Sequence, residues 1–490
     1  MSNEDHESFV STKEGCLQSE IFLIIIMGAV SIFVRNTTMP WINFGRRMDK
    51  SIFGFWMKFV VDFMIIVAPM ALSLTIFSDH LSTIVRSFVA TLGLTLILTT
   101  IEAMHIGPVV NLKNVLNRII DEQHHPTKFF TYIRSIMFIL INFAILAVDL
   151  PIFPRKFAKT VDYGYSLMDL GVAAVAYTMG MASSLKTLNE KEKRETESKK
   201  RAVKRRTAWL SHPAAVLFVI GAARTSVLAA LQYPQHVSEY GQHWNFFFTI
   251  GVMKIVDRIL PRSYPLLLTL IFGIAHQIVL MSGYEEWILV EGANDRSTFF
   301  AANAEGIVSL PGYLTLFYGA MTIGKFIANT GIRIKSWLHR TMHLFIYAMI
   351  FLALEHFVAQ PLVGKPSRRV VNLTFILGQL SILTFGCAIA MSTQMCTIFL
   401  WAAGVPHFSN GDDPFHVTEP CLAVSINSHT LVTFMIANVL TGLTNMSIDT
   451  HNAKDEHAVI ILTVYSLIVS LVPHYLSQRK SKLFGERKKE

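Results

Sequence analysis

The stretch FFTYIRSIMFILINFAILAVDLPIFPRKFAKT, residues 129–160, joins a long apolar run to an abruptly polar end. The apolar part has about 20 residues, the length that a helix needs to cross the hydrocarbon core of a bilayer. Asp149 ends the run, and two prolines follow that prevent the helix from simply continuing. The cations that come next are Arg155, Lys156 and Lys159. The stretch therefore predicts a membrane helix after which the chain turns back near the membrane surface.

The composition of the whole chain supports a membrane protein. The 490 residues are 52% hydrophobic and only 16% charged, whereas a soluble domain carries about 25% charged residues. On such a protein the net charge of +9 indicates cytoplasmic loops and membrane surface, not nucleic acid. We find no zinc spacing, Walker loop or GxSxG elbow. The four cysteines are too scattered to indicate a disulfide framework or a metal cluster: Cys16, Cys387, Cys396 and Cys421.

About thirteen apolar runs are long enough to cross a bilayer as helices. They lie near residues 21–39, 53–78, 82–106, 129–151, 166–186, 208–231, 245–260, 264–282, 307–329, 338–359, 370–400, 424–446 and 457–476. The run 370–400 is long and can be tilted or broken. Because most connections are short, the sequence predicts a single all-α, polytopic membrane domain over residues 1–490.

The basic segment KTLNEKEKRETESKKRAVKRR, residues 186–206, gives the clearest orientation signal. A short and strongly basic loop between spans stays in the cytoplasm. With thirteen spans, the basic C-terminal tail falls on the same side and the acidic N-terminus on the opposite side. Three loops disagree with this assignment. The basic loops 149–164 and 361–369 fall on the non-cytoplasmic side, and the loop 402–422, on the cytoplasmic side, has no Lys or Arg.

The same parity places four polar segments on the non-cytoplasmic side: DLPIFPRKFAKT, EYGQHWNFFFT, NAEGIVSLPGY and TGLTNMSIDT. Ionisable groups at membrane depth are costly unless they are paired or face a wet cavity. The four segments therefore predict one shared polar cavity. Their polar residues are Asp149, Arg155, Lys156, Lys159, His243, Asn245, Asn303, Glu305, Asn445 and Asp449.

Each segment also fits a purely structural role. Asp149 can be an interfacial cap, and the cations after it can snorkel to lipid phosphates. His243 can belong to an aromatic belt at the membrane surface. Asn303 and Glu305 can cap the helix that follows them, and the polar residues of 441–450 can satisfy helix contacts.

The spacing in the first segment favours chemistry. Lys159 comes ten positions after Asp149, a reach that lets Lys159 fold back toward Asp149. A carboxylate can take a proton from a hydroxyl, and an ammonium group can hold developing negative charge. Arg155 and Lys156 can form a basic clamp for phosphates. These residue types at a lipid interface are suited to group transfer to a lipid headgroup.

The stretches AVDLPIFPRKFAKT, YGYSLMDLGV, EYGQHWNFFFT, NAEGIVSLPGY and TGLTNMSIDT resemble the glycosylphosphatidylinositol (GPI) inositol acyltransferases. The resemblance implies a multi-pass protein of the endoplasmic reticulum membrane with a lumenal active site. Such an enzyme moves a fatty acyl chain, usually palmitoyl, from acyl-CoA to the inositol 2-hydroxyl of glucosaminyl-phosphatidylinositol. This chain has FPRK where the family often has FPRR, and NAEGI, with Ala304, where the family has NREGI.

The resemblance also implies roles for residues. The family's catalytic aspartate and lysine match Asp149 and Lys159, so Asp149 would act as general base, and Lys159 would orient it or stabilise the thioester oxyanion. The residues expected to bind substrate are Arg155, Lys156, His243, Asn245, Asn303 and Glu305. Acyl-CoA is expected as co-substrate, with no metal or other cofactor and no nucleic acid, and the protein is expected to be a monomer among membrane lipids.

Two other functions compete with this one. A different membrane O-acyltransferase would use His243 or another histidine on another hydroxylated lipid. A polytopic lipid or solute transporter would use the buried ions as a proton relay. The transporter is disfavoured because we see no inverted repeat, and thirteen spans do not divide into halves.

Three segments fit the acceptor pattern for N-glycosylation, at Asn36, Asn372 and Asn445. The first falls on the predicted cytosolic side, and the other two lie within or against predicted spans. We therefore expect little or no glycan.

Overall fold

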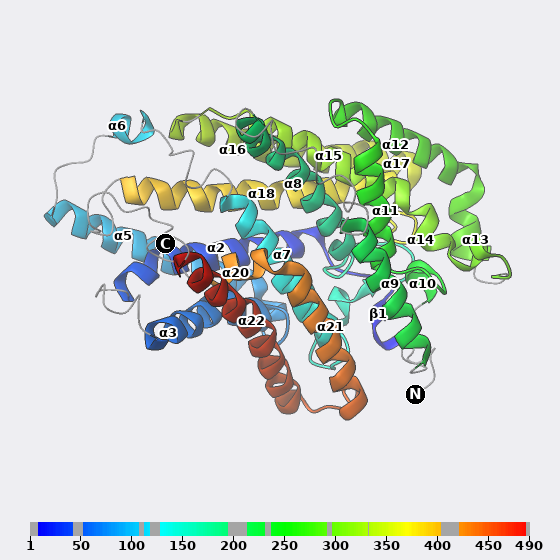
Figure 1. Ribbon diagram of the computed structural model, residues 1–490, viewed down its shortest axis with the longest axis horizontal. Coiled ribbons are helices and arrows are strands. Elements are labelled where there is room, and N and C mark those ends of the chain that lie inside the picture. The colour runs from blue at the N-terminus through cyan, green and yellow to red at the C-terminus, as the bar shows by residue number, and fades with distance from the viewer. Residues whose placement is uncertain are drawn as a thin grey trace. The chain divides into compact units, whose positions relative to one another are not determined.

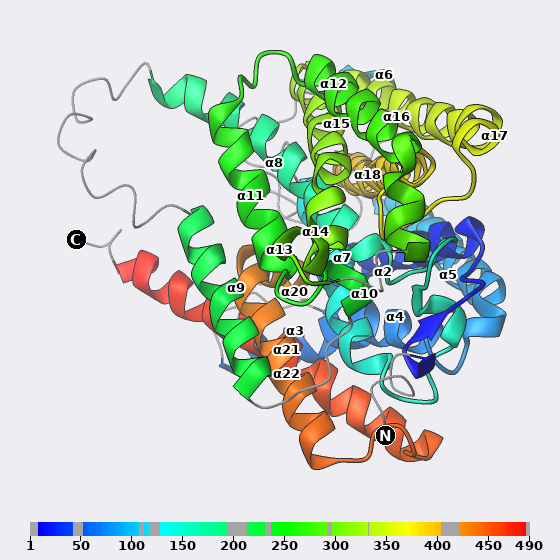
Figure 2. The same ribbon diagram turned by 90° about the vertical axis from the view of Figure 1, so that its right-hand side faces the viewer.

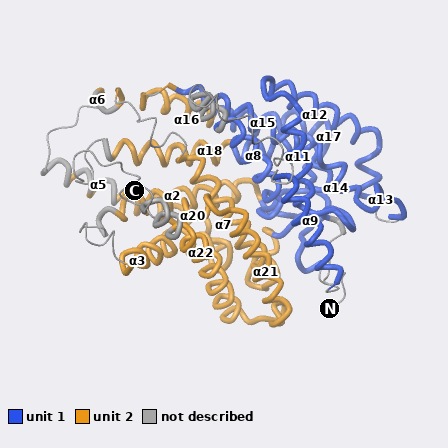
Figure 3. The backbone as a smooth tube through the Cα atoms, in the orientation of Figure 1, with its two compact units in different colours: residues 1–16, 158–330, 346–383 blue, residues 17–157, 331–345, 384–490 orange. Residues whose placement is uncertain are grey.

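The computed structural model describes residues 8–42, 52–106, 112–117, 128–194, 213–230, 237–291, 296–331, 333–402 and 421–486, and these are mostly helical (Figure 1). The chain divides into two compact units (Figure 3). Unit 1 comprises Met1–Cys16, Ala158–Thr330 and Ile346–Leu383, and unit 2 comprises Leu17–Phe157, Gly331–Phe345 and Thr384–Glu490. The helices α16 (Ile334–Leu354) and α18 (Leu373–Ala402) contribute residues to both. The expectation of one domain stays a prediction.

Ten helical segments among the described residues are long and apolar enough to cross a membrane. They are Gln18–Met39, Ile52–Ser73, Lys128–Ala147, Pro213–Ala230, Pro265–Tyr284, Ala304–Ala328, Ile334–Val363, Leu373–Leu400, Thr430–Ser447 and Asp455–Ser477. The chain is thus a polytopic helical membrane protein. The three other predicted runs are also helical: they coincide with α5 (Leu81–Ile106), α8 (Leu170–Arg194) and α11 (Phe246–Ile259). The run 370–400 forms the continuous helix α18.

Unit 1 is built around α8 and α15 (Leu310–Ala328), which pack along each other. A side chain at Gly180 of α8 would overlap the carbonyl oxygen of Phe317, so glycine permits this close approach. On the other side α15 packs against α12 (Pro265–Val279), and Figure 2 shows these two helices side by side. Unit 1 also contains α9 (Pro213–Ala230), which packs on α11. Its remaining elements are the short helices α10 (Val237–Tyr240), α13 (Phe299–Ala302), α14 (Ala304–Val308) and α17 (Gln360–Val363) and the π-helices η4 (Leu280–Tyr284), η5 (Trp287–Glu291) and η6 (Glu355–Ala359).

A two-stranded parallel sheet in unit 1 adds to the expected all-helical fold. It pairs β1 (Ser11–Thr12) with β2 (Lys159–Thr160), with Ser11 opposite Lys159. This pairing fixes the backbone that carries Lys159. The predicted basic loop 186–206 begins within α8, and residues 195–212 lie outside the described part of the chain.

Unit 2 is formed by helices from both ends of the chain. The central helix α7 (Lys128–Ala147) packs against α2 (Gln18–Ile42), α20 (Leu422–Ser428), α21 (Thr430–Ser447) and α22 (Asp455–Glu486). α21 and α22 form an antiparallel pair that is visible in Figures 1 and 2. The remaining elements are α3 (Ile52–Asp62), η1 (Phe63–Val67), α4 (Ala68–Ser73), η2 (Ser78–His80), α5, α6 (Leu112–Asn117) and η3 (Arg155–Phe157).

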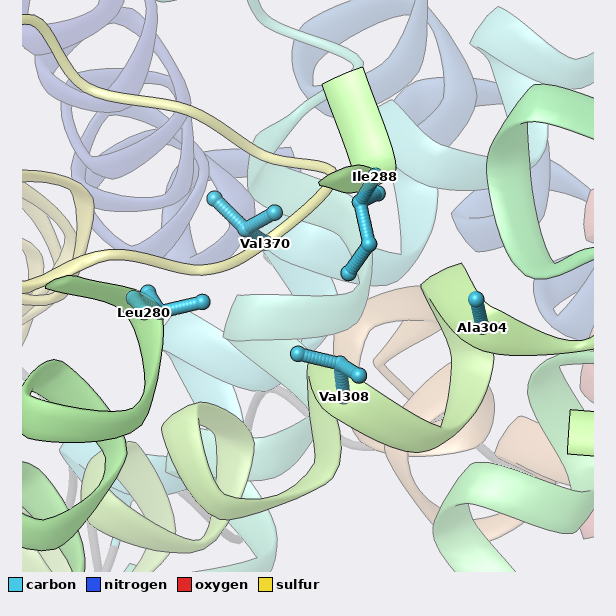
Figure 4. Close-up of a cluster of buried hydrophobic side chains, with 5 residues drawn as sticks. All are labelled: Leu280, Ile288, Ala304, Val308 and Val370. Atoms are coloured by element: carbon cyan, nitrogen blue, oxygen red, sulfur yellow. The ribbon is translucent and has the colours of Figure 1, made fainter. Parts of the chain in front are cut away.

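A small apolar core in unit 1 joins the segments that carry several of the predicted site residues. It consists of Leu280, Ile288, Ala304, Val308 and Val370, all at most 8% exposed (Figure 4). Ala304 precedes a predicted site residue in the chain, and its methyl group lies in this core. The position that differs from the NREGI pattern therefore serves packing here.

Candidate active site

Asp149 lies in the turn that ends α7 in unit 2. The helical hydrogen-bond pattern tightens at this point, because the Asp149 N–H donates to the carbonyl of Leu146, three residues back, over 3.1 Å. The residue is only 6% exposed. Asn445, near the end of α21, donates from its side-chain Nδ2 to Asp149 Oδ2 over 2.7 Å. The carboxylate thus has a fixed orientation within unit 2.

Arg155 folds its guanidinium back onto the same turn. It donates to the carbonyl oxygens of Val148 (2.7 Å), Leu150 (2.8 Å) and Phe153 (3.0 Å). Burial lowers the pKa of Arg155 to about 10, and the charge of Asp149 opposes that shift. Arg155 is therefore charged at neutral pH and binds carbonyls of the turn that follows α7. Its predicted contact with substrate phosphate stays a prediction.

Lys156 points to two acids of unit 2. Its Nζ lies 2.9 Å from Glu20 Oε1 and 3.3 Å from Asp79 Oδ1. Partial burial alone would lower the pKa of Lys156, but the bonds to Glu20 and Asp79 and their charges together outweigh it, and the net shift is upward. Because Asp79 is largely exposed, the pair with Asp79 is a surface pairing of small net energy.

Lys159 begins a partly buried network that we call the lysine cluster: Lys159, Glu239, Arg368 and Asp169 of unit 1. Lys159 pairs with Glu239. Arg368 lies 3.3 Å from Glu239 and 3.0 Å from Asp169. Asp169, fully buried, also accepts from the backbone and hydroxyl of Thr160, next to Lys159. Two cations and two anions balance, which is the arrangement that buried charges require.

Electrostatics keep the arginine of this cluster charged and its neighbour Tyr240 neutral. Burial by itself would lower the pKa of Arg368. The nearby charges, those of Asp169 and Glu239 foremost, raise it by more, so the net shift of the pKa is upward. Burial raises the pKa of Tyr240 well above its usual value, and the charge of Glu239 adds to that shift. Tyr240 is therefore a neutral hydroxyl beside a charged network.

Glu305 belongs to a second network of unit 1. It is 1% exposed and pairs with Arg296 at 2.7 Å and with Arg369 at 3.3 Å. Arg369 also pairs with Asp162 at 2.8 Å and donates to the carbonyl of Ile288, in the apolar core of Figure 4. Since Arg368 and Arg369 are adjacent in sequence, one short loop connects Glu305 with the lysine cluster.

The backbone of that loop is strained where it leaves the two arginines. Val371 has φ of 52°, a left-handed conformation that is rare for a β-branched residue and costs about 1–3 kcal/mol. His276 of α12 contacts the carbonyl oxygens of Val370 (2.9 Å) and Val371 (3.2 Å) through Nε2. Asn372 accepts from the N–H of Ser367 over 3.1 Å. These contacts hold Arg368 and Arg369 in place.

The other predicted substrate-binding residues build a compact turn in unit 1. Asn303 accepts from the backbone N–H groups of His243 and Trp244, each over 2.9 Å. Asn245 is the N-cap of α11, accepting from Phe247 N–H, and it donates to Thr225 over 3.0 Å. The ring of His243 is exposed. The two asparagines thus shape the turn that presents His243, and the substrate contacts predicted for these residues stay predictions.

A family model described as GWT1 matches residues 2–476. The chain belongs to the GWT1 family. GPI-anchored wall transfer protein 1 of Schizosaccharomyces pombe is 32% identical over 357 residues, 71% of this chain and 72% of the relative. The Saccharomyces cerevisiae protein of that name is 29% identical over 467 residues, 86% and 88% of the two chains. Glucosaminyl-phosphatidylinositol-acyltransferase PIGW of Mus musculus is 26% identical over 510 residues, 96% and 97% of the two chains.

The structure thus groups the predicted site residues of this GWT1-family chain within each unit. Asp149, Arg155 and Lys156 share unit 2. Lys159 and Glu305 belong to two networks of unit 1, and the expected approach of Lys159 to Asp149 stays a prediction.

Sequence reasoning did not select the partners of these residues in the GWT1-family chain. They are Asp162, Asp169, Glu239, Arg296, Arg368 and Arg369. Asn445 was among the polar residues of the predicted cavity, but its bond to Asp149 was not predicted. A signal for two of them was present, because loop 361–369 is basic on the predicted non-cytoplasmic side. Both arginines pair with acids of unit 1, Arg368 with Asp169 and Arg369 with Glu305.

Proposed function

We propose that this protein transfers a fatty acyl chain, palmitoyl in the first instance, from acyl-CoA to the inositol 2-hydroxyl of glucosaminyl-phosphatidylinositol during GPI-anchor biosynthesis. The observation that carries the proposal is the match to a relative named as a glucosaminyl-phosphatidylinositol acyltransferase over 96% of this chain and 97% of the relative. The proposed enzyme acts as a monomer in the endoplasmic reticulum membrane and needs acyl-CoA but no metal or other cofactor.

The proposed topology has about thirteen spans, with a lumenal N-terminus, a cytosolic C-terminus and a cytosolic loop at 186–206. Helices at the predicted apolar runs support it. The active site lies on the lumenal side. Two basic loops on that side carry cations that are paired or hydrogen-bonded within their own unit, such as Lys159 and Arg369, so the loops carry less net charge than their sequences indicate.

In the proposed mechanism Asp149 takes the proton of the inositol 2-hydroxyl as its oxygen attacks the thioester carbonyl. Lys159 stabilises the negative charge that develops on the carbonyl oxygen. The carbon–sulfur bond then breaks, the CoA thiolate leaves, and the proton held by Asp149 neutralises it. Lys156 would exchange its acids for a phosphate of CoA or lipid, and Arg155 would hold the turn near it.

The remaining predicted residues would contact the acceptor or support that contact. We propose that His243 meets the glucosaminyl-phosphatidylinositol headgroup, because its ring is exposed on a turn that Asn245 and Asn303 hold. Glu305 would act through Arg369, by fixing the loop that also carries the lysine-cluster arginine.

The test is acylation of glucosaminyl-phosphatidylinositol by labelled palmitoyl-CoA in membranes that lack the native enzyme, at matched protein levels. Asp149→Asn is expected to lower turnover about 10²–10⁴-fold. Lys159→Met is expected to lower turnover as well, and the double variant should lose less than the product of the two losses. Asp449→Asn is the matched control, since Asp449 is an exposed carboxylate bonded to Asn452. Near-normal turnover of well-folded Asp149→Asn would refute the general-base role.

A further inference from the structure

The side chain of Asn445 is held on both sides. Its Nδ2 donates to Asp149 Oδ2 over 2.7 Å, and its Oδ1 accepts from the hydroxyl of Thr450 over 3.3 Å. A carboxylate can only accept, so the nitrogen must be the atom that faces Asp149. Thr450 is 3% exposed, and its position therefore fixes the amide. The orientation of Asn445 is set before any substrate arrives.

The turn that carries Asp149 is held independently by Arg155. Bonds from the guanidinium to the carbonyls of Val148 and Leu150, at 2.7 and 2.8 Å, fix the backbone on both sides of Asp149. These bonds act on the backbone of the turn and not on the carboxylate itself. The bond from Asn445 acts on the carboxylate, and it comes from α21, a different helix of the same unit.

Two side chains of unit 2 interact electrostatically with Asp149: Arg155 and Tyr465. Arg155 donates to the carbonyls of Val148 and Leu150, and the Tyr465 hydroxyl donates to the carbonyl of Asn142 over 2.7 Å. Asn445 donates directly to the carboxylate.

We propose that Asn445 is a positioning residue that aims one carboxylate oxygen of Asp149 at the acceptor hydroxyl, by binding the other. This inference rests on the proposed function, in which Asp149 is the base. A charge-assisted bond also favours the ionised carboxylate, the form that can take a proton. Asn445 would not touch the substrate, and its effect would pass through Asp149.

The test uses two variants of opposite character. Asn445→Ala removes this donor, and a less precisely oriented base should lower kcat about 10–100-fold while the KM for palmitoyl-CoA stays within about twofold. Asn445→Asp keeps size and shape but places a second carboxylate beside the first, and like charges at this distance disfavour ionisation. Asn445→Asp should therefore be less active than Asn445→Ala near neutral pH. A role in packing alone predicts the opposite order.

The pH profile gives a second readout. The bond stabilises the ionised form, so in Asn445→Ala the acid limb of the kcat profile should move to higher pH by about one unit. Asn452→Ala is the matched control, because Asn452 makes an equally short bond, 2.8 Å, to the exposed carboxylate of Asp449. It should behave as the unmodified protein.

Asp149→Asn in the same assay separates the two proposals. If Asp149→Asn is active, the base role itself fails. If Asp149→Asn is inactive while both Asn445 variants turn over normally, or if Asn445→Asp exceeds Asn445→Ala, only the positioning role is overturned.

Discussion

Removal of the Arg368 guanidinium is the sharpest test of the buried charges in unit 1. In Arg368→Met, Lys159 still neutralises Glu239, but Asp169 loses its cation at 3.0 Å and keeps hydrogen bonds from neutral groups, Thr160 and Ser166 among them. Asp169 is fully buried and Arg368 is 12% exposed. Breaking such a pair by removing one partner costs about 3–5 kcal/mol, because a charge stays buried without compensation. Unfolding should therefore occur at a markedly lower temperature.

A second substitution distinguishes this cause from lost packing. Asp169→Asn in the Arg368→Met background removes the uncompensated charge and keeps an oxygen that accepts from Thr160. It should recover about 1–3 kcal/mol, the usual coupling between residues in contact. The expected order of apparent Tm is unmodified protein, then the double variant, then Arg368→Met.

The assay is thermal unfolding of detergent-purified protein, followed by size-exclusion chromatography of the soluble fraction. Arg86→Met is the control, since Arg86 is exposed on α5 and, within the described part of the chain, bonds to Ser82 and Thr83 of its own helix. Its Tm should change little. The reasoning is wrong if Arg368→Met melts with the control, or if the double variant is less stable than Arg368→Met.

Three further outcomes are expected. Glycosidase treatment should not shift the protein on a gel, because the side-chain nitrogen of each sequon asparagine already donates within the protein, to Tyr132, Lys365 or Asp149. Gly180→Ala should lower the Tm, since its new methyl would overlap a backbone oxygen of α15, and a Tm equal to that of the unmodified protein would refute that close contact. Arg35→Met should destabilise by about 3–5 kcal/mol, because its partner Asp62, 2.7 Å away, is fully buried; the same Tm shift in a variant lacking both charges would count against that explanation.

Much of this protein was determined by the sequence alone. Apolar runs of membrane length have few alternatives to a helix, because backbone groups in lipid must be paired within the segment. That constraint is local, so the predicted runs coincide with helices. The sequence also placed Asp149 at the end of α7, because an acid followed by prolines ends an apolar helix. The motifs around it carried the family resemblance that the match over residues 2–476 confirms.

Only the tertiary structure decided which polar groups meet. Asp149 and Asn445 are 296 residues apart in sequence. Ser11 and Lys159, which lie opposite each other in the two-stranded sheet, are also far apart in sequence. Periodicity and composition report the surroundings of a residue along its own helix, not the loop that a remote helix brings to it. The basic loop 361–369 shows the difference. Its arginines count as free positive charges in a sequence, but buried acids from other elements neutralise them once the chain has folded.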